Sequence, residues 1–335
     1  MVRFGIVGTG RISDWVLKGA AQDPRVQVTA VCSRTVDAAE AFVNRNPLAA
    51  GAKIYTSVEE MAADPQVDAI YIGTPNQTHC EYTLAGLKAG KHVLCEKPLA
   101  INAEEGRRMV EAARQSGCLL MEAMVSTLNP NFCAAAARID EISPVRQYSS
   151  YFCQYSSKYE ALKRGEVATA FMPGTAGALR DVGVYTLYPL VALFGRPDAV
   201  RGSLKTVQTS EGLADVHGTA LLEYEGMDAT VTWSKTYDSF QPTEIAGENG
   251  NLILDEIHIA RRAEIVPHAA PTSGQGPKPG RTLISDGLPY NEYYYEFKEF
   301  ADLLEQGKTE SEANSLETSL TVLEIIDELL SVCGA

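Results

Sequence analysis

The chain has 335 residues, which is too long for one ordinary hydrophobic core and fits two domains of common size. Its formal net charge of -14 argues against a nucleic acid or an anionic membrane as partner, because both need clustered basic side chains. Hydrophobic residues make up 45% of the chain, which is enough for sizeable cores, but no apolar run approaches the roughly 20 residues that cross a bilayer.

The first 122 residues alternate short apolar runs with amphipathic runs. The predicted strands span residues 4–7, 26–33, 54–56, 69–73, 92–95 and 118–122. The predicted helices span residues 12–21, 36–46, 58–63, 79–89 and 103–116. Regular strand–helix alternation is typical of a parallel sheet covered by helices on both faces. We therefore expect an α/β domain with a doubly wound parallel sheet at residues 1–122.

The pattern changes after residue 122, and we assign 123–335 to a second domain. Helical periodicity marks 131–142 and 178–194, and the end of the chain carries predicted helices at 289–305 and 315–331. A strand is predicted at 145–154, alternating patches fill 199–266, and Gly-Glu-Asn-Gly at 247–250 has the composition of a hairpin turn. Residues 267–282, rich in Pro and Gly, predict an irregular loop. This pattern predicts an α+β domain with an open, mainly antiparallel sheet.

A glycine turn links the first predicted strand to the first helix. The sequence there is Gly8-Thr9-Gly10-Arg11-Ile12, followed by Ser13 where a third glycine or an alanine is usual. Gly8 suits the tight turn and Gly10 suits close approach of a pyrophosphate, which the amides of the helix start would then face. We predict that residues 8–12 bind a dinucleotide, the alternative being an ordinary strand-to-helix turn.

The end of the second predicted strand bears on the choice of cofactor. An acidic residue there would bind the ribose diol of NAD, but this chain has Ser33 and Arg34. The Arg34 guanidinium suits a 2′-phosphate, so NADP is favoured. If Arg34 is merely solvated, NAD is equally acceptable.

The tripeptide Glu96-Lys97-Pro98 follows a predicted buried strand and so lies at the carboxyl edge of the sheet, where open α/β sheets bind ligands. The Lys97 ammonium could hold a substrate hydroxyl or carbonyl, or lower the pKa of a neighbouring acid. A surface lysine at a strand end is the alternative reading of the tripeptide taken alone.

Four motifs occur in order along the chain. They are the Gly-x-Gly turn, Thr74-Pro75-Asn76 with His79, Glu96-Lys97-Pro98, and Gly-Ala-Leu-Arg-Asp-Val-Gly-Val-Tyr at 177–185. Over essentially its whole length the chain resembles the Gfo/Idh/MocA oxidoreductases. The resemblance implies a Rossmann domain followed by a domain with a large open antiparallel sheet. It also implies a catalytic role for Lys97, and cofactor contacts for Thr74, Pro75, Asn76, His79, Glu96 and Lys97.

Asp181 and Tyr185 lie four residues apart on a predicted helix, hence on one face of it. Tyr185 is our candidate acid/base; its ordinary pKa of about 10 is high for a base, but Lys97 could lower it. Asp181 would orient the substrate or the lysine. In the competing assignment Lys97 carries the proton and Tyr185 positions the substrate. Many family members have histidine at the position of Tyr185. A tyrosine there makes this chain similar to the dihydrodiol and xylose dehydrogenases of the family.

We therefore expect an NAD(P)-dependent dehydrogenase or reductase that acts on the CH–OH group of a sugar, a polyol or a related diol or carbonyl compound. A non-catalytic, nucleotide-sensing regulator of the same fold is the alternative. Further candidates for contact with the substrate are Glu122, Asn129 and Arg180. The spacing of the seven cysteines predicts neither a metal site nor disulfides, which suggests a reduced, cytoplasmic protein. The sheet pattern suggests a homodimer or homotetramer.

Overall fold

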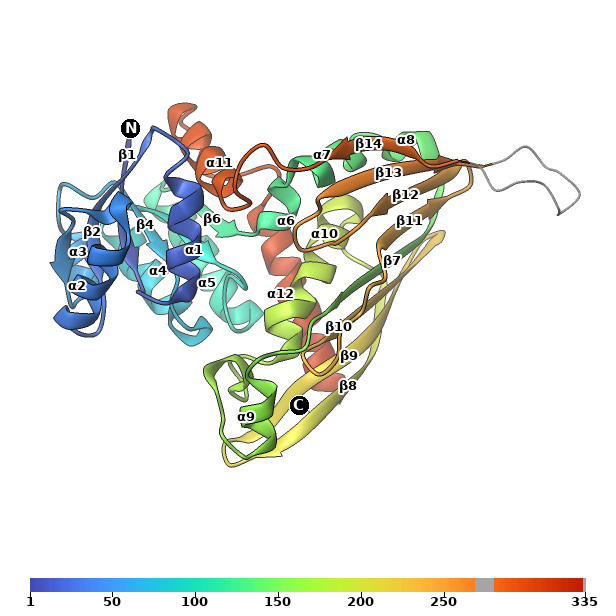
Figure 1. The fold of residues 1–335 in the computed structure, drawn as a ribbon, viewed down its shortest axis with the longest axis horizontal. Helices are drawn as coiled ribbons and strands as arrows, with labels where there is room; N and C mark the ends of the chain where they lie inside the picture. Colours follow the sequence, from blue (N-terminus) through green and yellow to red (C-terminus); the bar gives the residue numbers. More distant parts are fainter. Residues whose placement is uncertain (269–279, 334–335) are drawn as a thin grey trace, which may run out of the picture. The chain divides into compact units, whose positions relative to one another are not determined.

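The computed structural model describes residues 1–268 and 280–333 (Figure 1). Contacts group the chain into two units, Met1–Val125 with Tyr290–Leu323 and Ser126–Pro289 with Glu324–Ala335. The expected division at 122/123 differs from this grouping in that residues 290–323 join the first unit. Of the predicted loop at 267–282, residues 269–279 lie outside the described residues.

The first unit contains a six-stranded parallel sheet in the order β3-β2-β1-β4-β5-β6. Its strands are β1 Val2–Val7, β2 Val26–Cys32, β3 Lys53–Tyr55, β4 Ala69–Ile72, β5 His92–Glu96 and β6 Leu120–Ala123. The strand order reverses between β1 and β4, and Val7 is in register with both Cys32 and Ile72. The carboxyl ends of β1, β2 and β4 are therefore level at the switch point, where such sheets bind ligands. The predicted Rossmann fold is confirmed.

Helices pack against this sheet, and short polar side chains begin several of them. They are α1 Arg11–Ala20, α2 Val36–Arg45, α3 Val58–Ala62, α4 His79–Lys88, α5 Ala103–Ser116 and α11 Tyr294–Glu305. Thr35, Ser57 and Asn102 accept backbone N–H bonds at the starts of α2, α3 and α5. The long α12, Leu316–Cys333, contributes to both units.

Helix α11 belongs to the first unit because it covers β1 and α1. The ring centroids of Phe297 and Phe300 lie 5.2 and 5.4 Å from that of Phe4. At Gly19 an added Cβ would lie 2.5 Å from the carbonyl carbon of Tyr293, so only glycine allows this approach of α11 to α1.

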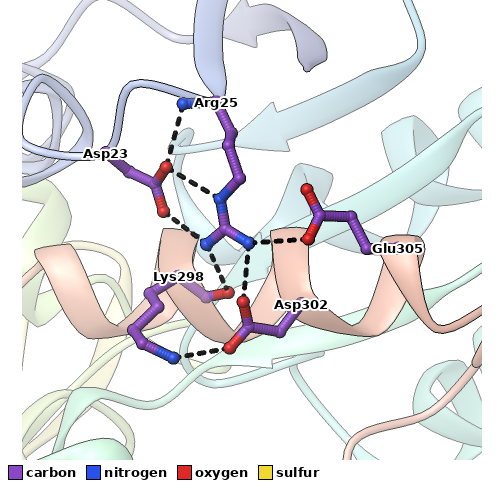
Figure 2. Close-up of polar contacts among 5 residues, drawn as sticks. All are labelled: Asp23, Arg25, Lys298, Asp302 and Glu305. Atoms are coloured by element: carbon purple, nitrogen blue, oxygen red, sulfur yellow. Dashed lines mark hydrogen bonds and ion pairs between the residues drawn. The ribbon is translucent and has the colours of Figure 1, made fainter.

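An ion-pair network joins the turn just before β2 to α11 (Figure 2). The Arg25 guanidinium donates to both carboxylate oxygens of Asp23, to Asp302 at 2.7 Å and to Glu305 at 3.1 Å. Lys298 pairs with the other oxygen of Asp302 at 2.5 Å. The Arg25 contacts with Asp302 and Glu305 link residues that are 277 and 280 positions apart in the sequence.

The second unit contains an eight-stranded sheet in the order β14-β13-β12-β11-β7-β10-β9-β8. Its strands are β7 Val145–Cys153, β8 Ala199–Thr209, β9 Gly212–Tyr224, β10 Met227–Ser234, β11 Thr243–Gly247, β12 Gly250–Leu254, β13 Arg262–Pro267 and β14 Thr282–Asp286. Only β7 and β10 pair in parallel among these described strands. The mainly antiparallel sheet is confirmed, and the hairpin turn at 247–250 joins β11 to β12.

The helices of this region are shorter than the sequence pattern predicts. They are α6 Val125–Leu128, α7 Pro130–Ala136, α8 Ile139–Ile142, α9 Tyr159–Lys163 and α10 Val184–Phe194. The predicted helix at 178–194 is in fact a π-helical turn, Leu179–Gly183, that leads into α10. A residue outside the segment contacts its start: the buried Asp215 carboxylate on β9 accepts the Leu179 N–H at 2.6 Å. Within the described ranges no helix is long and apolar enough to cross a membrane.

Candidate active site

The glycine turn leaves room for a ligand where the prediction requires it. Gly8 has φ of 98°, and a Cβ there would lie 2.5 Å from the Gly73 carbonyl oxygen. A Cβ on Gly10, by contrast, would meet no atom of the described residues within 4 Å. Ser13, at the third motif position, is buried and donates its hydroxyl to the Gly8 carbonyl at 2.8 Å. The Ser13 hydroxyl thereby stabilises the turn at Gly8, while the space beside Gly10 is not filled by other described residues.

The end of β2 presents polar groups beside this turn. The Thr9 and Ser33 hydroxyls lie 3.1 Å apart, and Arg34 is exposed. The Thr35 hydroxyl caps α2. From the last turn of α2, Arg45 donates to the Thr9 carbonyl at 2.8 Å and to Asp14 at 2.8 Å. Sequence reasoning missed Arg45, because it lies far along the chain from the turn that it braces.

The loop after β4 and the loop after β5 are tied together by a buried histidine. The His79 ring has one nitrogen 2.9 Å from the Pro98 carbonyl and the other 3.0 Å from the Thr74 carbonyl. Burial lowers the pKa of this imidazole. Both ring nitrogens face loop carbonyls, so this geometry gives His79 the role of joining the two predicted cofactor loops.

Lys97 stands at the carboxyl end of β5, half-buried, and its bond to Pro98 is cis. Glu96 beside it is buried and accepts the Tyr71 hydroxyl at 2.8 Å. Two further buried carboxyls, Glu122 on β6 and Glu296 on α11, interact favourably with the Lys97 charge. Lys97 is therefore the positive centre of an otherwise acidic buried group.

Burial shifts the pKa of both of these carboxyls. It raises the pKa of Glu122 to about 7, although this carboxyl accepts the Leu99 N–H at 2.9 Å. Burial, reinforced by the charge of Glu96, raises the pKa of Glu296 well above its ordinary value. Sequence reasoning proposed Glu122 as a substrate contact and missed Glu296, which no local motif marks.

The second unit carries the predicted polar pair. Asp181 lies in the π-helical turn and Tyr185 in the first turn of α10. Asp181 pairs with Lys235, the residue after β10, whose Nζ lies 2.5 Å from Oδ2 of Asp181. The Tyr185 and Phe152 rings meet edge to face, with their centroids 5.4 Å apart. The His258 ring stacks on the Phe152 ring, with a centroid distance of 4.2 Å. Lys235, Phe152 and His258 were not found from the sequence, since three separate strands or loops supply them.

The two remaining substrate candidates are buried. Arg180 is 6% exposed, faces the charges of Asp215 and Asp327, and has its pKa lowered by burial. Asn129 caps α7 by accepting the N–H groups of Asn131 and Phe132. Its buried Nδ2 has no hydrogen-bond partner in the described part of the chain. Arg180 thus faces the interior of its unit, whereas Asn129 keeps one unused donor.

The described residues bring no group of three His, Cys, Asp or Glu side chains together in a way that could hold a metal ion. The prediction of no metal site stays a prediction.

A doubly wound sheet with a glycine turn at its switch point is the architecture of dinucleotide-binding domains, and in this chain Lys97 lies at the carboxyl end of β5. The family model described as "Oxidoreductase family, NAD-binding Rossmann fold" matches residues 2–124, and the "GFO/IDH/MocA C-terminal domain" model matches residues 135–253. The chain belongs to the Gfo/Idh/MocA oxidoreductase family and is an NAD(P)-dependent enzyme. The expected family, enzyme class and cofactor are confirmed.

Among the relatives that match nearly the whole chain are two dehydrogenases. The chain is 38% identical to scyllo-inositol 2-dehydrogenase (NADP(+)) IolU of Bacillus subtilis (strain 168), across 100% of this chain and 98% of the relative. It is 28% identical to the trans-1,2-dihydrobenzene-1,2-diol dehydrogenase of Bos taurus, across 99% and 97%.

Solved structures share the fold at lower identity. A levoglucosan dehydrogenase in complex with NADH and levoglucosan has a TM-score of 0.84 at 20% identity, covering 99% of this chain and 97% of that one. KijD10, a 3-ketoreductase from Actinomadura kijaniata in complex with NADP, has a TM-score of 0.79 at 23% identity, with 98% and 97% covered.

Proposed function

We propose that this enzyme is an NADP-preferring dehydrogenase of a cyclic polyol, with an inositol as its first candidate substrate. The observation that carries the proposal is the 38% identity to a scyllo-inositol 2-dehydrogenase (NADP(+)) over the full length of both chains. Sugars and other vicinal diols form the wider substrate class, in line with the diol dehydrogenase relatives.

The residues at the β1–β4 switch point fit a dinucleotide. Residues 8–12 would hold the pyrophosphate, because the open side of Gly10 gives it access to the amides at the start of α1. The exposed guanidinium of Arg34 and the Ser33 hydroxyl would hold a 2′-phosphate. Thr74, Pro75, Asn76, Glu96 and Lys97 would border the nicotinamide half.

A bound nicotinamide would supply the hydride acceptor for the carbon that carries the reacting hydroxyl. The residues of this chain must then remove the hydroxyl proton. Tyr185 is our candidate for that proton, with Lys97 stabilising the developing negative charge on oxygen. Asp181 would accept a hydrogen bond from a neighbouring hydroxyl of the substrate. The competing assignment, with Lys97 as proton carrier and Tyr185 as positioning group, makes a different kinetic prediction.

A substrate panel tests the function. Purified enzyme with NADP+ or NAD+ is offered scyllo-inositol and other inositols, D-xylose and a trans-dihydrodiol, and absorbance at 340 nm is followed. We expect the largest kcat/KM with an inositol and NADP+. Tight NADPH binding without turnover of any alcohol or ketone would instead favour the nucleotide-sensing regulator.

Two variants separate the proton assignments. Lys97→Ala should abolish turnover under either assignment while NADPH binding persists, and near-normal turnover would remove Lys97 from the mechanism. Tyr185→Phe should lose roughly a hundredfold or more in kcat if the phenol transfers the proton. A loss of less than about tenfold would assign the proton to Lys97.

We also propose that the protein forms a homodimer or homotetramer through the sheet of the second unit. Large apolar side chains are exposed on or beside this sheet, among them Phe240 at 96%, Leu283 at 49% and Leu213 at 41%. Such side chains favour burial against a second copy. Light scattering coupled to size exclusion tests this, and a monomeric mass at micromolar concentration would contradict it.

A cytoplasmic location is a further proposal. Its support is the set of buried thiols at Cys32, Cys80 and Cys95, which is typical of proteins kept in a reducing compartment. Cell fractionation with an antibody tests the location.

A further inference from the structure

A buried ammonium lies directly after β10, at a position that no sequence motif marks. Lys235 is only 3% exposed. Its backbone is held on both sides, since its N–H donates to the Val216 carbonyl and its carbonyl accepts the Ser156 N–H. A buried charge is costly unless it is paired, so the groups around Nζ account for its presence.

Three groups surround Nζ of Lys235. It donates to the Asp181 carboxylate at 2.5 Å and to the Ala170 carbonyl at 2.9 Å, and it lies 4.5 Å from the centre of the Phe171 ring. A carboxylate, a carbonyl and an aromatic face together solvate a cation that water does not reach. The Asp215 carboxylate on β9 adds a more distant opposite charge.

The two partners of this ion pair differ sharply in exposure. The Lys235 side chain is 4% exposed, whereas that of Asp181 is 39% exposed. Oδ2 of Asp181 is therefore held by a buried partner, while part of the Asp181 side chain is exposed to solvent. A short charge-assisted bond of this kind restricts the direction in which the carboxylate can point.

The backbone under Asp181 is held as well. The π-helical turn that carries Asp181 is tied to β9, where Asp215 accepts the Leu179 N–H at 2.6 Å. π-helical turns inside helices often occur at functional sites, where they re-aim side chains. Two charged residues thus hold this turn, Asp215 of β9 through its backbone and Lys235, directly after β10, through the Asp181 side chain.

We propose that Lys235 is a positioning residue for the reaction: it fixes the Asp181 carboxylate so that its accessible face accepts a hydrogen bond from a substrate hydroxyl. Lys235 acts through Asp181 and does not itself touch the substrate. This inference rests on the proposed function, because it assigns Asp181 to a polyhydroxylated substrate.

A double-mutant cycle tests the dependence of Lys235 on Asp181. Lys235→Met, Asp181→Asn and the double variant are compared with wild type for kcat and KM on the best panel substrate. We expect Lys235→Met alone to lower kcat/KM roughly ten- to a hundredfold, because a misplaced contact group costs about that much. In the Asp181→Asn background the same substitution should change kcat/KM less than about threefold. If the loss of kcat/KM in the double variant equals the product of the losses in the two single variants, the proposal is overturned.

Controls separate positioning from general damage to the fold. Lys205→Met removes an exposed lysine of the same sheet whose ammonium donates to the Ser203 hydroxyl, and it should leave kcat/KM at the wild-type level. NADPH affinity, measured by fluorescence, should be the same in all variants. A Lys235→Met protein that has lost NADPH binding or cooperative unfolding would be replaced in the cycle by Lys235→Gln, which retains polarity at the site.

A further arm does not need a substrate. If no panel compound is turned over, the proposed function fails, and the contact itself is decided by crystal structures of wild type and Lys235→Met. A reoriented or disordered Asp181 side chain in the variant supports the positioning role. An Asp181 carboxylate with unchanged position and order would overturn it.

Discussion

The proposed preference for NADP depends on Arg34, whose exposed guanidinium lies just after the end of β2. We expect Arg34→Ala to weaken NADP+ binding roughly ten- to a hundredfold, the value of a lost charge-assisted hydrogen bond. NAD+, which lacks the 2′-phosphate, should be affected less than about threefold. Titration of both cofactors against wild type checks this, with the exposed Arg164→Ala as a matched control. Equal losses for the two cofactors would contradict the assignment.

Glu122 makes the stability of the first unit depend on pH. Its pKa is raised to about 7 in the folded protein by burial, so the folded state holds a proton that the unfolded state has released. The stabilisation is complete below the unfolded pKa of about 4.3 and is lost as pH rises through about 7. Glu122→Gln keeps an acceptor for the Leu99 N–H and cannot ionise.

The variant should therefore show a flatter decline in unfolding free energy between about pH 4.5 and 7.5. By pH 8 the difference from wild type, relative to pH 4.5, should be on the order of 3 kcal/mol at most. Urea unfolding at a series of pH values measures it. Glu111→Gln, an exposed change on α5, serves as the control. Parallel curves for wild type and Glu122→Gln would show that Glu122 does not hold the extra proton.

At the scale of elements, local sequence patterns explain why most helices and strands of the first unit could be predicted. The strands of the first unit are apolar runs ended by glycine turns or polar residues, and its helices begin at capping side chains such as Thr35 and Asn102. The π-helical turn at Leu179–Gly183 was not predicted, and its contact with Asp215 on another strand leaves no mark on the local sequence pattern. The same limit hid Lys235, Arg45 and Glu296, whose partners lie in other elements.

The attachment of α11 is testable through Arg25. Arg25→Ala leaves the buried Asp23 carboxylate without its main partner, and we expect a loss of about 1–3 kcal/mol in unfolding free energy at pH 7. Arg25 lowers the pKa of Asp23, so this contribution is present above the unfolded pKa of about 3.9 and is lost as pH falls below it. Lys298→Ala, which removes a more exposed pair, should cost less than about 1 kcal/mol. Denaturation curves in which both variants lose equally would assign no special role to Arg25.

At the scale of the whole molecule, the first unit is built from two segments that are far apart in the sequence. Residues 290–323 follow the entire second unit in sequence, yet they complete the first. Composition and periodicity predicted a helix near 289–305 but contained no sign of the unit that it joins. That information resides in long-range packing, such as Phe297 and Phe300 against Phe4.

This interleaving predicts that residues 1–125 do not form a stable nucleotide-binding module alone. Without α11 the fragment exposes Phe4 and part of Tyr71, both fully buried in the intact chain. Each such aromatic side chain contributes roughly 1.5–3 kcal/mol of burial, a large share of the stability of a small domain. We expect the 1–125 fragment to bind a hydrophobic dye, to unfold without a cooperative transition and to bind NADPH at least about tenfold more weakly.

Adding residues 290–323 through a flexible linker should restore cooperative unfolding and NADPH binding, because it returns the two phenylalanines that cover Phe4. The matched control is the same fusion with Phe297→Asp and Phe300→Asp, which keeps the length of the segment but removes its apolar face. If the 1–125 fragment unfolds with the same midpoint as the fusion, α11 is an accessory layer and the first unit folds from contiguous sequence alone. If only the unmodified fusion recovers, the first unit cannot be completed until the second unit has been synthesised.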